Sequence, residues 1–307
     1  MRKSLDASVF FIMFFICAIW GSQQVAIKMV EQYVSPMLQL SLRSGLSALI
    51  VFILFNRRDG ITLHLKAPGV AFSGLCAGLL FALEFFMVAL GIPKTSTGHI
   101  TLFLYTAPLF TAVGLYFLVR DERMTRLQWS GIIVAFAGIA VAVQFSFADR
   151  SATAGDLFAL AAGLSWGISS IIIRTSQLST LPPACTLFYQ LTITSLMLAL
   201  AACFTHETRF ILNAAVLLSL AYQTIIVSVI SYLCWFTLLR YYHVSSLGTL
   251  ILLTPVMGIA AGAVSLGETL QSSFLTGSVL ILSGLMLTRL GRENHRLRES
   301  PTSYTGK

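Results

Sequence analysis

Two ionisable side chains, Arg43 and Glu84, lie deep inside long apolar segments of the 307-residue chain. If these segments cross a membrane, a rise of about 1.5 Å per residue places both side chains roughly 10 Å below the same surface. An ionisable group inside a membrane costs about 2.5–3.5 kcal/mol on insertion scales, so each is expected to have a partner or a function. We therefore predict that Arg43 and Glu84 lie at one level, either as a structural ion pair or as part of a site for a polar ligand.

Three more polar residues extend this prediction. Lys28 ends the first apolar segment and His99 begins the fourth, so both lie near the same surface as Arg43 and Glu84. Gln24 stands four residues before Lys28 and shares its helix face. We expect the four ionisable side chains to form one polar cluster. Two alternatives stay open, because the Lys28 ammonium can instead reach lipid headgroups and His99 can be an ordinary solvated histidine.

The composition indicates that these segments belong to an integral membrane protein. Hydrophobic residues make up 56% of the chain and charged residues only 10%, against about 25% in soluble domains, and the mean hydropathy is +0.84. Apolar runs near the ~20 residues that cross a ~30 Å hydrocarbon core recur from end to end. The net charge of +8 comes from Lys and Arg in short loops and near the C-terminus, which is not the basic face of a nucleic-acid-binding protein.

The five cysteines fall within the apolar segments, without the short spacings of a metal site or a disulfide framework. The histidines are not grouped with acidic or thiol ligands either. We therefore expect no metal and no cofactor, with the cysteines acting as small buried hydrophobic residues. The sequence has no G-x-x-x-x-G-K-[ST] loop, so we expect no ATP-binding site in this chain.

Hydropathy marks ten spans joined by short connections. They cover residues 7–29, 36–55, 68–91, 97–118, 127–145, 155–175, 182–204, 211–238, 244–265 and 273–290. The polar residues 291–307 that follow are expected to form a disordered cytoplasmic tail. The basic and then apolar N-terminus resembles a signal peptide, but no cleavage motif follows it, so we interpret the first span as retained.

The positive charges predict the orientation of these spans. Of the twenty Lys and Arg residues, fifteen lie on the side of the N-terminus and only Lys94, Arg150 and Arg209 on the opposite side, while Lys28 and Arg43 lie in or at the edge of helices. Positive residues concentrate on the cytoplasmic side of membrane proteins. Both termini are therefore predicted to be cytoplasmic, in a plasma membrane of the bacterial inner-membrane type.

The second half of the chain repeats the first at an offset of 146 residues. The stretch "AIWGSQQVAIK" (18–28) then meets "LSWGISSIIIR" (164–174). The same offset matches Pro36 with Pro182, Glu122 with Glu268, Gly131 with Gly277 and Gly138 with Gly284. We predict two five-helix repeats, residues 1–150 and 151–290. Because five is odd, the second repeat must enter the membrane in the opposite sense, and inverted repeats are typical of alternating-access transporters with a site at the repeat interface.

Two five-helix halves, each with Trp-Gly in its first helix and a proline in its fourth, resemble the EamA-like family of the drug/metabolite transporter superfamily. Each half also ends in a glycine-containing helix after a Glu-bearing turn, as in "DERMTRLQWSGIIVAFAGIAV" and "GETLQSSFLTGSVLILSGLML". The resemblance implies an all-α membrane protein of ten transmembrane helices. It also implies a central cavity lined by helices one to four of each repeat, with the fifth helices at the periphery.

The second repeat replaces charge by neutral polarity. Tyr189 corresponds to Arg43, and Ser231 lies close to the position that corresponds to Glu84. The residues predicted to face a cavity are Tyr189, Gln223, Ser231 and Trp235, together with Tyr105 of the "YTAP" stretch. The Trp-Gly step shared by both halves is assigned mainly to the fold. Substrate choice is expected at Gln23 and Gln24, which become serines in the second repeat.

Pro108 and Pro255 occupy equivalent places inside the fourth and ninth spans. Each proline frees a carbonyl group and permits a kink, so the pair predicts either a gating hinge or a fixed bend. The glycines of the fifth and tenth spans are expected to be helix-packing contacts.

The favoured function is secondary transport. We expect export of small polar metabolites such as amino acids or their derivatives, with a small-molecule substrate and membrane lipids as partners, and with coupling to protons through Glu84. A passive channel or facilitator is the alternative. A membrane-embedded enzyme is less favoured, because the sequence offers no nucleophile and base, or His/Asp cluster, at membrane depth. The oligomeric state is left open.

Overall fold

The computed structural model describes residues 7–65, 67, 69–118, 124–144, 150–241, 250–251, 253–269 and 271–299. Within these ranges the chain is helical, apart from turns and one isolated bridge between Val34 and Phe210. The first half forms α1 (Ala7–Lys28), α2 (Pro36–Asp59), α3 (Ile61–Leu65), α4 (Val70–Gly91), α5 (Thr97–Leu104), α6 (Ala107–Leu118) and α7 (Arg126–Gln144). The second half forms α8 (Arg150–Thr175), η2 (Gln177–Thr180), α9 (Pro183–Phe204), α10 (Ala214–Ala221), η3 (Tyr222–Ser231), α11 (Tyr232–Tyr241), α13 (Leu253–Leu266) and α14 (Ser272–Glu299).

Seven of the helical stretches in the described residues are long and apolar enough to cross a membrane. They are Ala7–Lys28, Pro36–Asp59, Val70–Gly91, Thr97–Leu118, Arg150–Thr175, Pro183–Phe204 and Ala214–Trp235. Three shorter apolar helices are Arg126–Ala142, Leu253–Leu266 and Phe274–Thr288. Each of the ten segments predicted from hydropathy overlaps one of these helices. The chain is therefore an all-α integral membrane protein.

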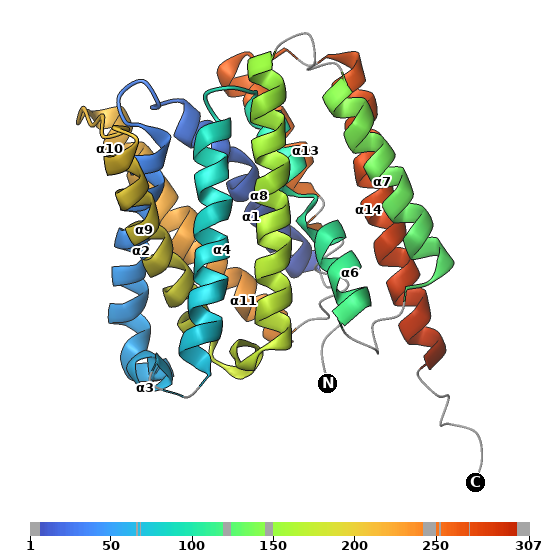
Figure 1. The fold of residues 1–307 in the computed structure, drawn as a ribbon, viewed down its shortest axis with the longest axis horizontal. Helices are drawn as coiled ribbons and strands as arrows, with labels where there is room; N and C mark the ends of the chain where they lie inside the picture. The colour runs from blue at the N-terminus through green and yellow to red at the C-terminus, as the bar shows by residue number, and fades with distance from the viewer. Residues whose placement is uncertain are drawn as a thin grey trace.

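The bundle of helices has two distinct ends (Figure 1). One end carries α3 and the last turns of α14, and is called the α3 end below. The other end carries the start of α10 and is called the α10 end. Successive long helices run between these two ends.

Among the predicted spans that the structure describes over their whole length, the fourth and the eighth are not continuous α-helices. The fourth span stops at Leu104, turns at Tyr105 and Thr106, and resumes at Ala107 as α6. Pro108 is the second residue of α6, where its missing N–H costs no helical hydrogen bond. The eighth span widens into the ten-residue π-helix η3 between α10 and α11. Such π segments are rare and frequently occur at functional sites.

The prediction of a disordered tail needs a correction. Helix α14 continues through Glu299, well past the end of its apolar part, so residues 291–299 are helical and not disordered. These residues are rich in good helix formers such as Arg, Leu and Glu, which explains why the helix continues into a polar sequence. Residues 300–307 lie outside the described residues.

The two halves of the chain are interleaved. α1 packs on α13 and η3 of the second half, while α8 packs on α5, α6 and α4 of the first half, and α2 packs on α9. The glycine of each Trp-Gly step makes this close approach possible. A Cβ added at Gly21 would lie 2.6 Å from the backbone nitrogen of Gly258, and one at Gly167 would lie 2.8 Å from Cβ of Phe110. Equivalent glycines therefore seat each half's first helix on the fourth span of the other half.

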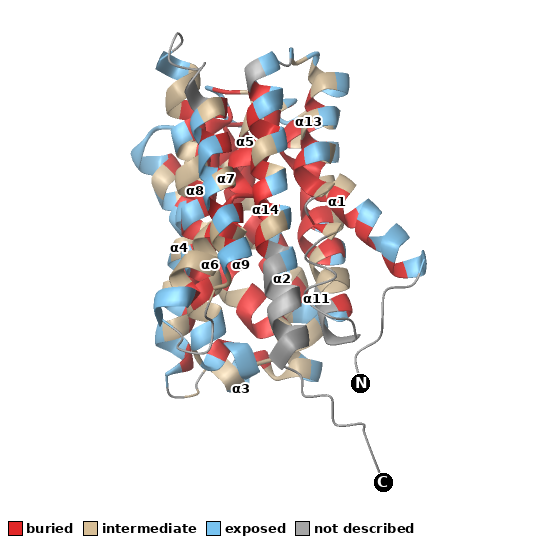
Figure 2. Ribbon diagram, turned by 90° about the vertical axis from the view of Figure 1, so that its right-hand side faces the viewer, coloured by how far each residue is buried: buried red, intermediate tan, exposed pale blue. Residues whose placement is uncertain are grey.

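Helices α7 and α14 pack on each other at one edge of the bundle (Figure 1). Their glycines meet the partner backbone, because a Cβ at Gly131 would lie 2.6 Å from the carbonyl oxygen of Gly284 and one at Gly138 would lie 2.7 Å from the nitrogen of Ile281. The glycines are thus helix-packing contacts, as predicted. Buried residues lie along the inward faces of the helices and exposed ones on the outside (Figure 2).

Candidate functional site

A cavity of about 240 Å³ lies between the two halves of the chain. Its aromatic walls are Trp20, Phe81, Phe85, Tyr105, Trp166, Tyr232 and Trp235. Its polar groups are Gln23, Gln24, Glu84, Ser170 and Gln190. The walls come from α1, α4, α8, α9 and α11, and from the end of α5 where the fourth span breaks. The volume is below the ~300–1,000 Å³ of drug-sized pockets, so it suits a small ligand.

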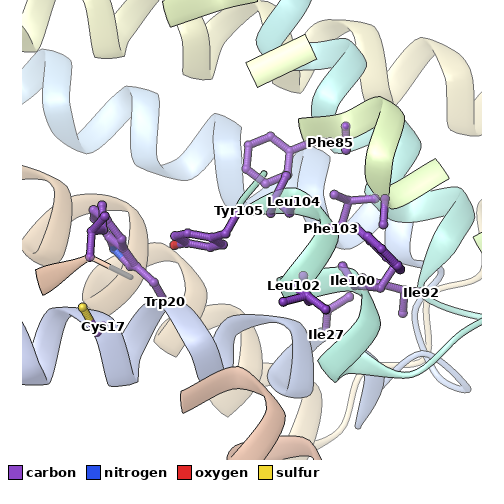
Figure 3. Close-up of a cluster of buried hydrophobic side chains, with 14 of the residues drawn as sticks. Cys17, Trp20, Ile27, Phe85, Ile92, Ile100, Leu102, Phe103, Leu104 and Tyr105 are labelled. Atoms are coloured by element: carbon purple, nitrogen blue, oxygen red, sulfur yellow. The ribbon is translucent and has the colours of Figure 1, made fainter. Parts of the chain in front are cut away.

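The aromatic side chains hold one another in place. Trp20 meets Tyr232 and Trp235 edge-to-face, each with ring centroids 5.7 Å apart, and its Nε1 donates a hydrogen bond to Ser231 Oγ at 2.6 Å. Tyr105 and Trp166 form a similar edge-to-face pair at 5.3 Å. Figure 3 shows the Tyr105 ring leaving the end of α5 and pointing toward Trp20. These contacts make a rigid apolar box that leaves ring faces available to a ligand.

Two polar groups of the cavity have unused hydrogen-bonding capacity. Glu84 is only 4% exposed, and its Oε2 has no hydrogen-bond partner among the described residues. The same holds for Oε1 of Gln24, which is 2% exposed. A buried polar atom without a partner is costly, so both atoms are suited to a ligand or to water in the cavity.

Arg43 lies behind the cavity wall. Its side chain is fully buried, and its guanidinium carbon lies 4.3 Å from the centroid of the Phe85 ring. None of the three guanidinium nitrogens has a hydrogen-bond partner in the described part of the chain. Arg43 and Glu84 interact electrostatically but do not come within ion-pair distance. The two side chains therefore lie near each other, and the direct ion pair that was one of the two alternatives does not form.

The prediction of one cluster with Lys28 and His99 is wrong. Lys28 Nζ donates to the carbonyl oxygen of Thr95 at 2.6 Å and lies 3.5 Å from Oε1 of Glu268. His99 Nδ1 lies 2.9 Å and 3.0 Å from the two carboxylate oxygens of Asp156. Lys28 and His99 thus each contact an acidic residue from the second half of the chain. Sequence reasoning could not place these acids beside α1 and α5, because tertiary packing alone brings them there.

The remaining predicted site residues divide into two groups. Gln24, Glu84, Tyr105 and Trp235 line the cavity. Tyr189, Gln223 and Ser231 do not line it, which corrects their prediction. Tyr189 packs on α4, where its ring would lie 2.8 Å from a Cβ added at Gly74. Ser231 holds Trp20 in place from behind.

Gln223 is fully buried within η3. Its Nε2 donates to Oε1 of Gln39 at 3.2 Å and to Oγ of Ser219 at 2.9 Å, so it ties η3 to α2. The π-helix changes the angle between successive residues, which is why an α-helical face count placed Gln223 wrongly beside Trp235.

The structure adds cavity residues that the sequence prediction missed. Trp166, Ser170 and Gln190 line the second repeat's wall. The repeat contained the signal for Trp166, because Trp20 and Trp166 are matched at the 146-residue offset and both line the cavity. For Gln190 the repeat gave no matching cavity residue, and only its neighbour Tyr189 was predicted to face the cavity.

Both prolines stand at the start of a helix. Pro108 is the second residue of α6 and Pro255 the third residue of α13. The break before Pro108 is what turns Tyr105 into the cavity. A role of these prolines as gating hinges stays a prediction.

Comparison with known proteins finds a family match in each half of the chain. The family model described as the EamA-like transporter family matches residues 7–144 and again residues 153–290, which together are most of the chain. The chain belongs to the EamA-like transporter family. The two matches fall on the two repeats inferred from the offset. This EamA-like chain is therefore a multi-pass membrane transporter with an EamA unit in each half.

Named relatives of this EamA-like chain include efflux pumps. A "Probable amino-acid metabolite efflux pump" of Salmonella typhimurium is 31% identical over 293 residues, covering 92% of this chain and 94% of the relative. The protein of the same name in Escherichia coli is 28% identical, covering 90% and 93%. A protein of known structure superimposes with a TM-score of 0.65 at 20% identity, covering 94% of this chain and 99% of its own, and so shares the fold.

Proposed function

We propose that this protein is a secondary transporter that exports small zwitterionic metabolites of the amino-acid class by alternating access. The observation that carries the proposal is the aromatic cavity with one free carboxylate, Glu84, on its wall and the unpaired guanidinium of Arg43 just behind it. The names of the two enterobacterial relatives support the same substrate class and direction.

The proposed architecture is ten transmembrane helices arranged as two inverted five-helix repeats. Three observations support it: the family model matches each half once, the packing partners of α1 and α8 are equivalent, and the ten apolar helices fall five to each half. In the proposed orientation the α3 end is cytoplasmic and the α10 end faces outward, because positive residues concentrate at the α3 end. The proposed location is a plasma membrane of the bacterial inner-membrane type.

The chemistry of the cavity matches an α-amino acid. The Glu84 carboxylate can accept hydrogen bonds from an ammonium group, and the surrounding ring faces attract the same cation. The Arg43 guanidinium lies behind the cavity-lining Phe85 ring, so its charge would attract a carboxylate on the same ligand without a direct hydrogen bond. The charge-assisted bonds between the ammonium group and Glu84 are about twice as strong as neutral hydrogen bonds. The Gln23 and Gln24 amides would then contact polar parts of the ligand side chain.

Coupling to protons is proposed to run through Glu84. The carboxylate can bind either a proton or the ammonium group of the substrate, but not both at once. A proton taken up from outside would therefore displace the substrate in one half of the cycle, and the substrate would displace the proton in the other. An exchange of this kind uses the proton gradient to drive export.

The test is transport by purified protein in proteoliposomes. With wild-type protein, we expect saturable efflux of a radiolabelled amino acid that is accelerated by unlabelled amino acid on the far side and by an inward proton gradient. Glu84→Gln should abolish the response to the proton gradient and lower efflux at least tenfold. Glu207→Gln, a change of an exposed carboxylate at the α10 end, should leave both unchanged.

Two results would contradict the proposal. Efflux that does not saturate and is not stimulated by substrate on the far side would indicate a passive channel or facilitator. A Glu84→Gln protein that still responds fully to the proton gradient would remove Glu84 from the coupling mechanism.

A further inference from the structure

Glu268 joins three elements at the α10 end of the bundle. It lies in the short connection between α13 and α14, and its side chain is only 11% exposed. Its carboxylate accepts hydrogen bonds from the backbone nitrogen and Oγ1 of Thr97 at 2.8 Å and 2.9 Å, and from the backbone nitrogen of Gly98 at 3.3 Å. It also pairs with Lys28 at the end of α1. One carboxylate of the second repeat thus holds α1 and the start of α5 in the first repeat.

Local geometry favours this position for a carboxylate. The first N–H groups of α5 lack helical partners and carry the positive end of the helix dipole, so an anion is stabilised there. Gly262 of α13 leaves space for the carboxylate, because a Cβ at this position would collide with Oε2 of Glu268. A glycine at position 262 therefore allows the Glu268 carboxylate to pack between α13 and the start of α5.

A second pair lies beside the first. Asp156 near the start of α8 accepts a hydrogen bond from Oγ1 of Thr95 at 2.6 Å and contacts His99 of α5. Thr95 also accepts the Lys28 ammonium through its carbonyl oxygen. The His99 ring stacks on Phe274 of α14, with ring centroids 3.9 Å apart. The segment 95–99 is thus held by α1, α8, α14 and the α13–α14 connection at once.

The cavity does not reach these polar contacts, and it extends from them toward the α3 end. Toward the α10 end, its lining on α1 ends at Gln24, one helical turn before Lys28. Toward the α3 end, it includes Ile173, two residues before the end of α8, and Leu187, the fifth residue of α9. The polar contacts therefore lie between the cavity and the α10 end.

We propose that Glu268 is a gating residue that closes the α10 end of the cavity by holding α1 and α5 together. The proposal rests on the alternating access proposed above. For the cavity to open at the α10 end, α1 must separate from α5 and from the α13–α14 connection, which breaks the Lys28–Glu268 pair. Charges are suited to such a gate, because both partners are hydrated when the gate opens, whereas a separated apolar contact would have to expose its surface to water.

The test measures access to the cavity without transport. In a protein whose five native cysteines are replaced by alanine, Gln24→Cys places one thiol at the inner side of the gate. A membrane-impermeant maleimide is then applied from the α10 side, which a separate Glu207→Cys protein identifies. We expect slow labelling of Gln24→Cys in the parent protein. Adding Glu268→Gln should raise the labelling rate at least fivefold, because the amide keeps an acceptor for α5 but loses the charge that holds Lys28.

Three further variants make the result specific. Lys28→Met should raise labelling in the same way without altering the Thr97 contacts, so it tests the gate even if Glu268→Gln does not fold. Lys28→Arg should keep labelling slow, because the ion pair is retained. Glu31→Gln, which removes a carboxylate that interacts with Lys28 and whose Oε2 has no hydrogen-bond partner among the described residues, should also keep it slow.

Unchanged labelling in folded Glu268→Gln or Lys28→Met protein would overturn the proposal. Faster labelling in both variants would support the gate even if the efflux assay showed a channel or a different substrate. The failure of the gate and the failure of the proposed transport function can therefore be told apart.

Discussion

The guanidinium of Arg43 is fully buried beneath the aromatic box, yet it has no hydrogen-bond partner among the described residues. Its guanidinium carbon lies 4.3 Å from the centroid of the Phe85 ring, and Tyr232 and Glu84 interact with it electrostatically. Burying a charge without a close partner destabilises a fold, so the position argues for a role other than structural support. The same reasoning applies to Oε1 of Gln24, although burying a neutral amide oxygen without a partner destabilises the fold less than burying a charge.

Replacement of Arg43 should separate structure from function. Arg43→Met removes a charge that has no partner, so we expect the free energy of unfolding in detergent to stay within about 1 kcal/mol of wild type or to rise. Substrate efflux should fall at least tenfold, because the carboxylate of the ligand loses its cation. Arg58→Met, at a 75% exposed side chain of the α3 end, is the control and should change neither quantity. A loss of 3–5 kcal/mol in Arg43→Met would instead identify a structural ion pair.

At the scale of elements, the cavity depends on two interruptions and two close contacts. The break between α5 and α6 turns Tyr105 inward, and the change from η3 to α11 presents Tyr232 and Trp235 to Trp20. The close contacts are those of α1 with α13 and of α8 with α6, each made possible by the glycine of a Trp-Gly step. Packing glycines of this kind are typical of helices in membranes.

These contacts predict that replacing different glycines by alanine changes the stability of the protein to different extents. Gly21→Ala places a Cβ against the backbone of α13, which cannot move aside as a side chain can, so we expect a loss of about 1–3 kcal/mol in thermal unfolding. Gly98→Ala is the matched control, because its Cβ would lie 3.4 Å from Ile259 in ordinary contact and its N–H to Glu268 is kept. Equal stability of the two variants would show that the α1–α13 contact is looser than described.

At the scale of the whole molecule, the two halves pack against each other around one cavity. Each half packs its first helix on the fourth span of the other half, so the contacts that hold these two helices come from both halves. The contacts of Lys28 and His99 with acids of the second half add polar links at the α10 end. This interleaving is the physical basis for the proposed alternation between two access states.

The orientation of the molecule can be tested with fusions. A fluorescent protein joined after Lys307 should fluoresce in bacteria, and alkaline phosphatase at the same site should be inactive, because both termini are proposed to be cytoplasmic. Phosphatase inserted after Arg209, in the connection between α9 and α10, should be active. The opposite pattern would invert the proposed orientation and place the gate on the cytoplasmic side.

Much of the fold was predictable from the sequence because its causes are local. Apolar length fixes where a helix can cross a membrane, and each of the ten predicted spans overlaps a helix. The 146-residue offset paired Gly21 with Gly167 and Trp20 with Trp166, and these pairs do occupy equivalent contacts. Depth along a helix is also a local property, which is why Arg43 and Glu84 could be predicted to lie at one level.

Tertiary structure alone decided which polar groups meet. Equal depth does not determine the direction a side chain takes around the bundle, so Lys28 and His99 turn to Glu268 and Asp156 and not to Glu84. The π-helix similarly turns Gln223 toward Gln39, against the α-helical expectation. Hydrophobic length and sequence repetition act along the chain, whereas partner choice depends on how helices rotate against one another. The sequence therefore determined the helices and their repeat, and packing determined the cavity and the partners of its polar groups.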